Sequence, residues 1–231
     1  YLFLVLGRLI FSSFLNKFKI SKKHNRWYVA YFKGNDFKKD LRKAHEIKNL
    51  PGRFFADPFV INYQDRTICF VEDFFFSESK GKISAIEIFE TGYKYLDIVL
   101  EENFHLSYPY LFVENGNLYM IPETSEVNQI RLYQSINFPT RWELKEVLME
   151  GVSAVDTVVF KNKNLWYMLT NICSSGIDDH SSELHIFYSE RFDSQEWKPI
   201  KKSNPIIFDS LKARNGGFFE LNNNQYRVNQ V

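Results

Sequence analysis

The apolar residues of this chain gather in short runs that alternate with polar turns. Four runs resemble one another, each with a polar residue near its start and aromatic or β-branched residues after it: 56–60, 107–112, 155–160 and 214–219. A polar turn and a second apolar run follow each of them. Runs of this composition between polar turns predict β-strands paired as hairpins. The Asn115-Gly116 dipeptide supports one such turn, because both residues tolerate positive φ.

The hairpins recur along the chain at a nearly constant spacing of roughly 50 residues, measured between the aligned positions Asp57, Tyr108, Asp156 and Asn215. Two more strand-like runs follow each of the first three hairpins, at 82–89 and 94–100, 129–134 and 142–148, and 183–189 and 197–201. Several strands per unit, at a period of about 40–50 residues, are typical of a β-propeller. The sequence therefore predicts an all-β, five-bladed β-propeller with four-stranded antiparallel blades.

The repeats also set the expected blade boundaries. Three complete blades are expected at about 53–103, 104–151 and 152–211, and a partial blade at 212–231. The chain begins with Tyr1 and its last strand ends abruptly, so we expect a fragment of a longer protein with an incomplete fifth blade.

The residues before the first blade are less regular. Residues 25–34 predict a strand without a nearby partner, which would close the ring by joining the last blade, so that the propeller domain covers 25–231. Residues 36–49 are expected to form a loop or a short helix over one propeller face.

Residues 1–24 are predicted to be a separate helical segment. The first 15 are mostly apolar, and four lysines follow between positions 17 and 23. A membrane-spanning helix needs about 20 apolar residues, which this run does not reach. The pattern predicts an amphipathic helix on an anionic membrane surface, or a linker helix that docks on the propeller or joins an upstream domain. The first alternative makes residues 1–23 a peripheral membrane contact.

Composition narrows the classes of partner and the compartment. The net charge of +1 gives no basic footprint for a nucleic acid. Cys69 and Cys173 lie in or next to predicted strands of different blades, so we expect reduced core thiols. The protein is therefore expected in the cytoplasm, where the amphipathic helix would place it at the inner face of the membrane.

Strand ends from every blade are expected to meet at one mouth of the central axis. The first two strands of a blade are antiparallel, so the start of the first and the end of the second lie at the same face. The catalytic candidates there are Asp57, Glu123 and Asp156. The substrate-binding candidates are Glu72, His105, Tyr108, Asn171, Arg214, Asn215, Arg227 and Gln230. Such a group suits a sugar, whose hydroxyls each need a partner, although each residue could instead only cap a strand end or a turn.

Two resemblances follow from these residues. Phe55-Ala-Asp-Pro-Phe59 resembles the first blade of five-bladed glycoside hydrolases of the family 43 and family 32 type. In that group the Asp of the Asp-Pro pair is the base or nucleophile, the second blade usually supplies a second Asp, and the third supplies a Glu as the acid. This chain has Tyr108 and Asp156 at those two later positions.

A closer resemblance is to the N-terminal domain of plant glucosamine inositolphosphorylceramide transferases and related bacterial proteins, some of which carry a formyltransferase-like domain upstream. It rests on the Asp57 motif, His105-Leu-Ser-Tyr-Pro109, Ile121-Pro-Glu123, Asp156, Arg214-Asn-Gly-Gly217 and Tyr226-Arg-Val-Asn-Gln230. It runs from about Trp27 to Gln230 and implies a carbohydrate context. A separate downstream domain is thought to carry out the transfer in the plant proteins.

Three functions stay open at this point. The first is a carbohydrate-active domain of a bacterial-type protein in glycan or glycolipid assembly, through sugar recognition or glycosyl transfer. The second is a glycoside hydrolase that uses Asp57 as base and Asp156 or Glu123 as acid, and the third is a non-catalytic scaffold. The histidines show no metal-ligand spacing, so no metal site is predicted, although the oxygen-rich axis is compatible with calcium.

Overall fold

The computed structural model describes residues 27–32, 43–176, 179–200, 204–221 and 224–230, so the helix expected at 1–24 lies outside the described residues. The first blade contains β3 (Arg53–Tyr63), β4 (Arg66–Phe75), β5 (Lys80–Ile88) and β6 (Tyr93–Leu100). The second contains β7 (Ser107–Glu114), β8 (Asn117–Glu123), β9 (Gln129–Asn137) and β10 (Arg141–Glu150), with the short 3-10 helix η2 (Ser125–Val127) between β8 and β9. In both blades each strand pairs antiparallel with the next.

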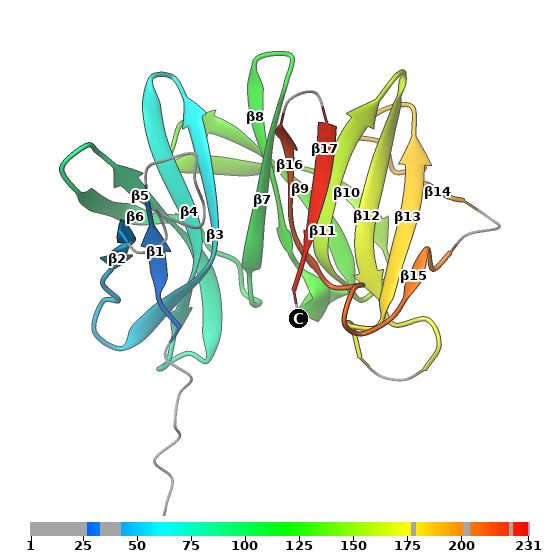
Figure 1. Ribbon diagram of the computed structural model, residues 1–231, viewed down its shortest axis with the longest axis horizontal. Helices are drawn as coiled ribbons and strands as arrows, with labels where there is room; N and C mark the ends of the chain where they lie inside the picture. The colour runs from blue at the N-terminus through cyan, green and yellow to red at the C-terminus, as the bar shows by residue number, and fades with distance from the viewer. Residues whose placement is uncertain (1–26, 33–42, 177–178, 201–203, 222–223, 231) are drawn as a thin grey trace, which may run out of the picture.

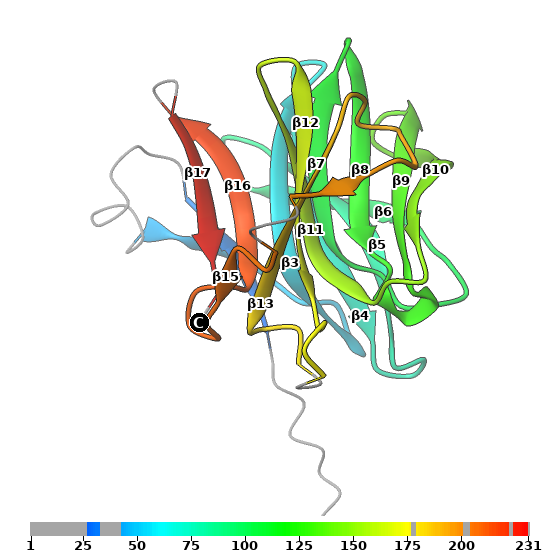
Figure 2. The same cartoon turned by 90° about the vertical axis from the view of Figure 1, so that its right-hand side faces the viewer.

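The third blade departs from the simple four-stranded pattern. It contains β11 (Ala154–Asn162), β12 (Leu165–Ile172), β13 (Glu183–Ser189), β14 (Lys198–Pro199) and β15 (Ile207–Phe208). Both short strands β14 and β15 pair with β13, so together they occupy the place of the fourth strand. The partial blade consists of the hairpin β16 (Asn215–Leu221) and β17 (Asn224–Asn229), which Figure 2 shows at one side of the molecule.

The predicted all-β propeller is confirmed, with the innermost strands β3, β7, β11 and β16 nearest the middle of the molecule (Figure 1). Every strand predicted for the first two blades is present, within a few residues at each end. The Asn115-Gly116 turn is also as predicted, with φ of 51° and 76° at its two residues.

The segment before the first blade contains a strand pair that the sequence did not predict. β1 (Val29–Tyr31) falls in the strand expected at 25–34, but it pairs with β2 (His45–Ile47), in the segment expected to be a loop or short helix. The two strands are held by apolar contact, because Val29 and Ile47 are buried against Phe55 and Val71 of the first blade. A three-residue strand gives too short a pattern to recognise in the sequence.

The first strand of each blade contains a β-bulge at the same place. The register shifts lie between Ala56 and Phe59, Ser107 and Tyr110, Val155 and Val158, and Asn215 and Gly217. The residues inside the first three bulges, Asp57, Tyr108 and Asp156, have φ of 46°, 45° and 51°. A bulge opposes two residues to one and redirects a side chain. The aligned positions of the repeat are therefore the positions at which the inner strands bend.

Aromatic packing joins neighbouring blades and keeps the inner strands together. Phe70 of the first blade packs edge-on against Trp142 of the second, with ring centroids 5.5 Å apart. The Tyr110 hydroxyl donates to the Val159 carbonyl of the third blade at 2.6 Å, and Phe160 stacks on Phe218 of the partial blade at 4.6 Å. These contacts between blades fix the relative positions of the bulges.

Replacing Phe70 with alanine tests the contribution of this packing. Phe70 is completely buried, so Phe70→Ala should lower the free energy of unfolding by about 3–5 kcal/mol through lost burial and a residual cavity. Urea unfolding measures the change. Phe89→Ala is the matched control, because Phe89 is 44% exposed, and it should cost about 0.5 kcal/mol or less. Equal losses for the two variants would contradict the assignment of Phe70 to the inter-blade core.

Candidate functional site at the propeller axis

Asp57 links the first two blades at the axis. The backbone N–H of Tyr108 donates to Asp57 Oδ2 at 3.2 Å, so one bulge contacts the side chain of the preceding one. Burial raises the pKa of Asp57, while this hydrogen bond and the nearby Arg214 guanidinium oppose the rise. The side chain stays half-exposed, which leaves the carboxyl accessible to a ligand.

Asp156 occupies the equivalent position in the third blade but is differently engaged. It is buried, and Oδ2 accepts hydrogen bonds from Arg214 Nε and, at 3.2 Å, from Gln230 Nε2. Burial is the largest influence on its pKa and raises it to about 7, whereas Arg214 lowers it. The sequence-predicted residues Asp156, Arg214 and Gln230 are thus brought into direct contact.

Asn171, Asn215 and Arg227 form a hydrogen-bonded support behind this group. Asn171 donates to the Ala213 carbonyl at 3.0 Å and accepts from the Asn215 backbone N–H at 3.0 Å. Asn215 donates to the Asp156 carbonyl at 2.8 Å, and Arg227 donates to the Ala213 carbonyl at 3.1 Å. Both asparagines are fully buried, so the structure places them as supports of the third and partial blades rather than on an open surface.

The remaining carboxyls of the site come from the second strands. Glu72 was expected at a strand end, but β4 continues to Phe75, and Glu72 pairs with Ala56 beside the bulge at Asp57. Glu123 is the last residue of β8, and Ser125 Oγ donates to its Oε1 at 2.8 Å. Burial raises the pKa of both glutamates, and the charge of Asp57 adds to the rise in each case. Asp57, Glu72, Glu123 and Asp156 therefore form one electrostatically coupled group, called here the axial carboxyl group, with Arg214 as its nearby cation.

Asp73, next to Glu72, belongs to a different environment. Strand alternation points it to the other face, where Arg53 and Ser84 donate to its Oδ2 at 3.1 and 2.7 Å. Glu72 and Asp73 are adjacent carboxyls in the sequence, but only Glu72 belongs to the axial site. Asp73 is hydrogen-bonded within its own blade.

Tyr108 lies beside the axial carboxyl group with an unsatisfied hydroxyl. Its side chain is 2% exposed and packs edge-on against Phe59. Among the described residues its hydroxyl has no hydrogen-bond partner. Burial, and then the charge of Asp156, raise the pKa of Tyr108, so the hydroxyl keeps its proton and stays a donor. Leaving such a group unpaired costs about 1–3 kcal/mol.

A cleft of about 450 Å³ opens onto two of these carboxyls. Asp57, Pro58 and Glu72 line one side, and Gln230 lines another. We call it the Asp57 cleft. Its remaining wall includes Trp27, Tyr28 and Phe54, and a second groove of about 610 Å³ continues past the same three aromatic residues.

These aromatic residues are not among the site residues predicted from the sequence. Trp27 and Tyr28 are 60% and 64% exposed. Asn49 fixes them to the first blade, because its amide donates to the Trp27 carbonyl at 2.6 Å and its oxygen accepts from Phe55 N–H at 2.9 Å. The signal in the sequence that could have pointed to this wall is the pair of adjacent aromatic residues, Trp27 and Tyr28, just before a short strand.

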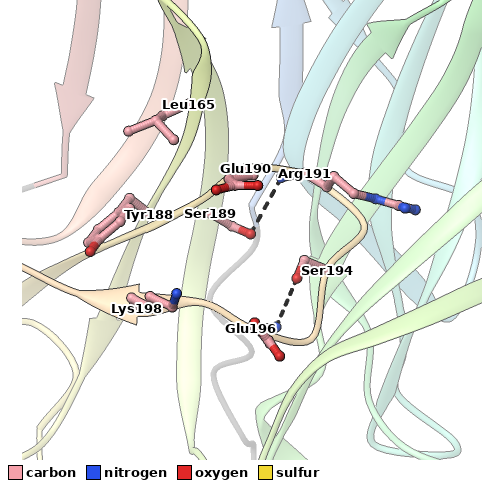
Figure 3. Close-up of a pocket in the computed structure, with 8 residues that line it drawn as sticks. All are labelled: Leu165, Tyr188, Ser189, Glu190, Arg191, Ser194, Glu196 and Lys198. Atoms are coloured by element: carbon pink, nitrogen blue, oxygen red, sulfur yellow. Dashed lines mark hydrogen bonds between the residues drawn. The ribbon is translucent and has the colours of Figure 1, made fainter.

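A further pocket lies away from the axis, at the outer part of the third blade (Figure 3). It has a volume of about 290 Å³ and is lined mainly by polar residues of β13, the following loop and β14, including Tyr188, Arg191 and Lys198. Arg191 is paired with Asp193. No residue of the axial carboxyl group lines it, so the Asp57 cleft is the better candidate for chemistry.

Among the described residues, no group of three or more His, Cys, Asp or Glu side chains could hold a metal ion. The loop between β12 and β13 also contains an acidic pair and a histidine. His180 is hydrogen-bonded with Ser153, and Asp179 accepts hydrogen bonds from Ser181 and Ser182, while Asp178 lies outside the described residues. Likewise, none of the helices in the described part of the chain is long and apolar enough to cross a membrane. Cys69 and Cys173 are not joined in a disulfide, and the first is buried while the second is half-buried.

Comparison with known proteins identifies the family of this domain. The model for the N-terminal part of glucosamine inositolphosphorylceramide transferase 1 matches residues 43–231. The chain belongs to this family. The Arabidopsis thaliana protein of that name is 34% identical over 186 residues, which cover 78% of this chain and 24% of that protein. The Oryza sativa subsp. japonica protein is 31% identical over 187 residues, with the same coverage.

The chain thus spans about a quarter of the length of the curated relatives it matches. Both relatives are plant proteins, so they give no support to the expected bacterial origin. They confirm the resemblance predicted from the Asp57 and His105 motifs.

Solved structures confirm the propeller. An exo-1,5-α-L-arabinanase from a bovine ruminal metagenomic library matches 90% of this chain and 84% of its own, with a TM-score of 0.58 and 9% identity. A family 43 endo-arabinanase from Bacillus licheniformis matches 78% and 70%, with a TM-score of 0.52 and 16% identity. At these identities the likeness shows the fold alone.

Replacing Arg214, the cation bonded to Asp156, should lower the free energy of unfolding by an amount that depends on pH. The pKa of Asp156 is higher in the folded chain than the ordinary value of 3.8, so its contribution to stability is greatest at low pH and is lost as pH rises through the folded pKa. Arg214→Met raises that pKa further. The variant should lose about 3 kcal/mol at pH 8 and clearly less at pH 5, measured by urea unfolding.

Arg191→Met serves as the control for Arg214→Met. Arg191 also pairs with an aspartate, but its side chain is 73% exposed. Its removal should change stability little at either pH. An equal loss for Arg214→Met at pH 5 and pH 8 would show that Asp156 does not depend on the guanidinium.

Proposed function

We propose that the Asp57 cleft and the axial carboxyl group bind a carbohydrate, and that the domain recognises a sugar in glycan or glycolipid assembly. One observation carries this proposal: polar side chains from all four blades converge beside a cleft with an exposed aromatic wall. Trp27 and Tyr28 form that wall, while Asp57 and Glu72 face it.

The chemistry of the cleft matches the needs of a sugar ring. Carboxyl and carboxamide oxygens accept hydrogen bonds from hydroxyls, and Asp57, Glu72 and Gln230 line the cleft. An aromatic face covers the apolar side of a ring, as amphipathic aromatic residues do at binding sites.

The relatives suggest which sugars to examine. Their name joins glucosamine to inositolphosphorylceramide, so the proposed ligand is the head group of a glycolipid or the amino sugar itself. Because the chain spans about a quarter of those proteins, glycosyl transfer is proposed for a complete protein and not for this domain alone. We further propose that it acts in the cytoplasm, with residues 1–23 as a contact to the inner face of the membrane and a formyltransferase-like domain as one candidate upstream neighbour.

Sugar binding is tested with an array of monosaccharides, disaccharides and nucleotide sugars that includes glucosamine. Trp27→Ala should weaken binding about tenfold, which corresponds to about 1.4 kcal/mol, because it removes one aromatic face of the cleft. Phe208→Ala is the control, since Phe208 is 58% exposed on the third blade, and it should leave the affinity unchanged. An array with no bound sugar for the wild type would refute the proposal and favour the scaffold.

Glycoside hydrolysis is the second candidate function. It is favoured by the coupling of Asp57 with other carboxyls of raised pKa, since an acid and a base of this kind cleave glycosides. In this alternative Asp57 is the base, and Asp156 or Glu123 is the acid. This alternative is weakened because Asp156 Oδ2 already accepts hydrogen bonds from Arg214 and Gln230.

Turnover separates the two functions. If the domain hydrolyses glycosides, Asp57→Asn and Asp156→Asn should each lower kcat at least 100-fold, while sugar affinity survives. Release of reducing sugar from the glycans that bind on the array is the measurement. Glu143→Gln, on the exposed face of β10, should behave like the wild type. Binding without product in the wild type would leave recognition as the function.

A further inference from the structure

We infer that Glu72 is the hydrogen-bond donor of the Asp57 cleft, and that His105 holds its carboxyl in place. This inference rests on the proposed carbohydrate binding. It assigns to a second-strand residue the proton-carrying role that the sequence analysis gave to Asp156 or Glu123.

Glu72 has the position that this role requires. It pairs with Ala56 across β3 and β4, directly beside the bulge at Asp57, and it lines the cleft with Asp57. Its side chain is 10% exposed. In contrast to Asp156 and Glu123, Glu72 makes no hydrogen bond shorter than 3.4 Å within the described part of the chain. The carboxyl is therefore almost buried and yet free to meet a ligand.

His105 defines which oxygen of Glu72 is free. The Gly81 backbone N–H donates to His105 Nδ1 at 2.9 Å, so the proton of the neutral ring lies on Nε2. Nε2 lies 3.4 Å from Glu72 Oε1. Burial lowers the pKa of His105, which keeps the ring neutral. Oε1 thus faces an N–H donor, and the proton of a neutral carboxyl belongs on Oε2.

The packing around Gly81 fixes the imidazole ring. A Cβ atom at position 81 would lie 2.4 Å from the Leu106 carbonyl oxygen, 2.9 Å from His105 Cε1 and 3.0 Å from Glu72 Oε1. Only glycine leaves room for the ring and the carboxyl together. The His105 backbone N–H also donates to Glu126 at 2.8 Å, which anchors the residue from the other side. His105 is accordingly a positioning residue.

The charges that face Glu72 keep it protonated. Asp57 on β3, Glu123 on β8 and Asp73 on β4 all act on it, and neutral His105 adds no charge. Burial and these three carboxyls raise the pKa of Glu72 to about 8. A neutral carboxyl both donates and accepts, so at neutral pH the cleft offers a donor to a sugar oxygen next to the acceptor Asp57.

The protonation of Glu72 is measured first, in the protein without ligand. The 13C NMR signal of Glu72 Cδ, assigned by its loss in Glu72→Gln, should titrate with a midpoint near 8. His105→Leu keeps the pocket apolar but removes the Nε2–H that faces the ionised carboxylate, so it should move the midpoint upward. A wild-type midpoint below 6 would overturn the inference.

Sugar affinity is then compared at pH 6.5 and pH 9.5 on the array of neutral mono- and disaccharides. The wild type should bind about tenfold more weakly at pH 9.5. Glu72→Gln retains an N–H donor, so its affinity at pH 6.5 should stay within about threefold of the wild type and should not fall at pH 9.5. Glu72→Leu should bind about tenfold more weakly at both values, and Glu143→Gln should follow the wild type.

The outcomes distinguish the two proposals. A pH-independent wild-type affinity, or a decline that persists in Glu72→Gln, would refute the donor role while sugar recognition stands. An array without any bound sugar would refute the proposed function and the donor role with it.

Discussion

The bulge in the inner strand of each blade is the constraint on which the rest of the site depends. It forces Asp57, Tyr108 and Asp156 into the left-handed region of φ, which is uncommon for an aspartate and costly for a bulky tyrosine. Packing between blades, as at Tyr110 and Val159, holds the strands in this geometry. Because each blade repeats the bend at the same depth, residues about 50 positions apart meet at one axis.

The convergence brings several carboxyls close together, which disfavours their ionised forms. The fold places a cation beside some of these carboxyls and not beside others. Asp57 raises the pKa of Glu72, Glu123 and Asp156, and Glu123 raises that of Glu72 and Asp156. Arg214 lowers the pKa of Asp57, Glu123 and Asp156. It bonds Asp156 directly, and the buried amides of Asn171 and Asn215 support that contact. Among the described residues Glu72 has no cation bonded in this way. Asp156 is therefore held by a guanidinium, whereas Glu72 lies beside the cleft without a close hydrogen-bond partner.

The exposure of the site residues separates those that support the structure from those that could contact a ligand. The third and partial blades supply a closed network of amides and guanidinium groups, whereas the first blade and the β1–β2 pair supply the open wall with Trp27 and Tyr28. A sugar approaching the axis would meet the first blade.

The sequence by itself determined the strand pattern, the repeat and the aligned positions, because alternating burial and turn residues are local and recur four times. It also predicted that Asp156, Arg214 and Gln230 would lie together. It did not reveal β2, which has three residues, or the aromatic wall at Trp27. Nor could it show that Glu72 faces the cleft while Asp73 pairs with Arg53. Those outcomes depend on strand register, on bulges and on which blade packs beside which, and only the tertiary structure decides them.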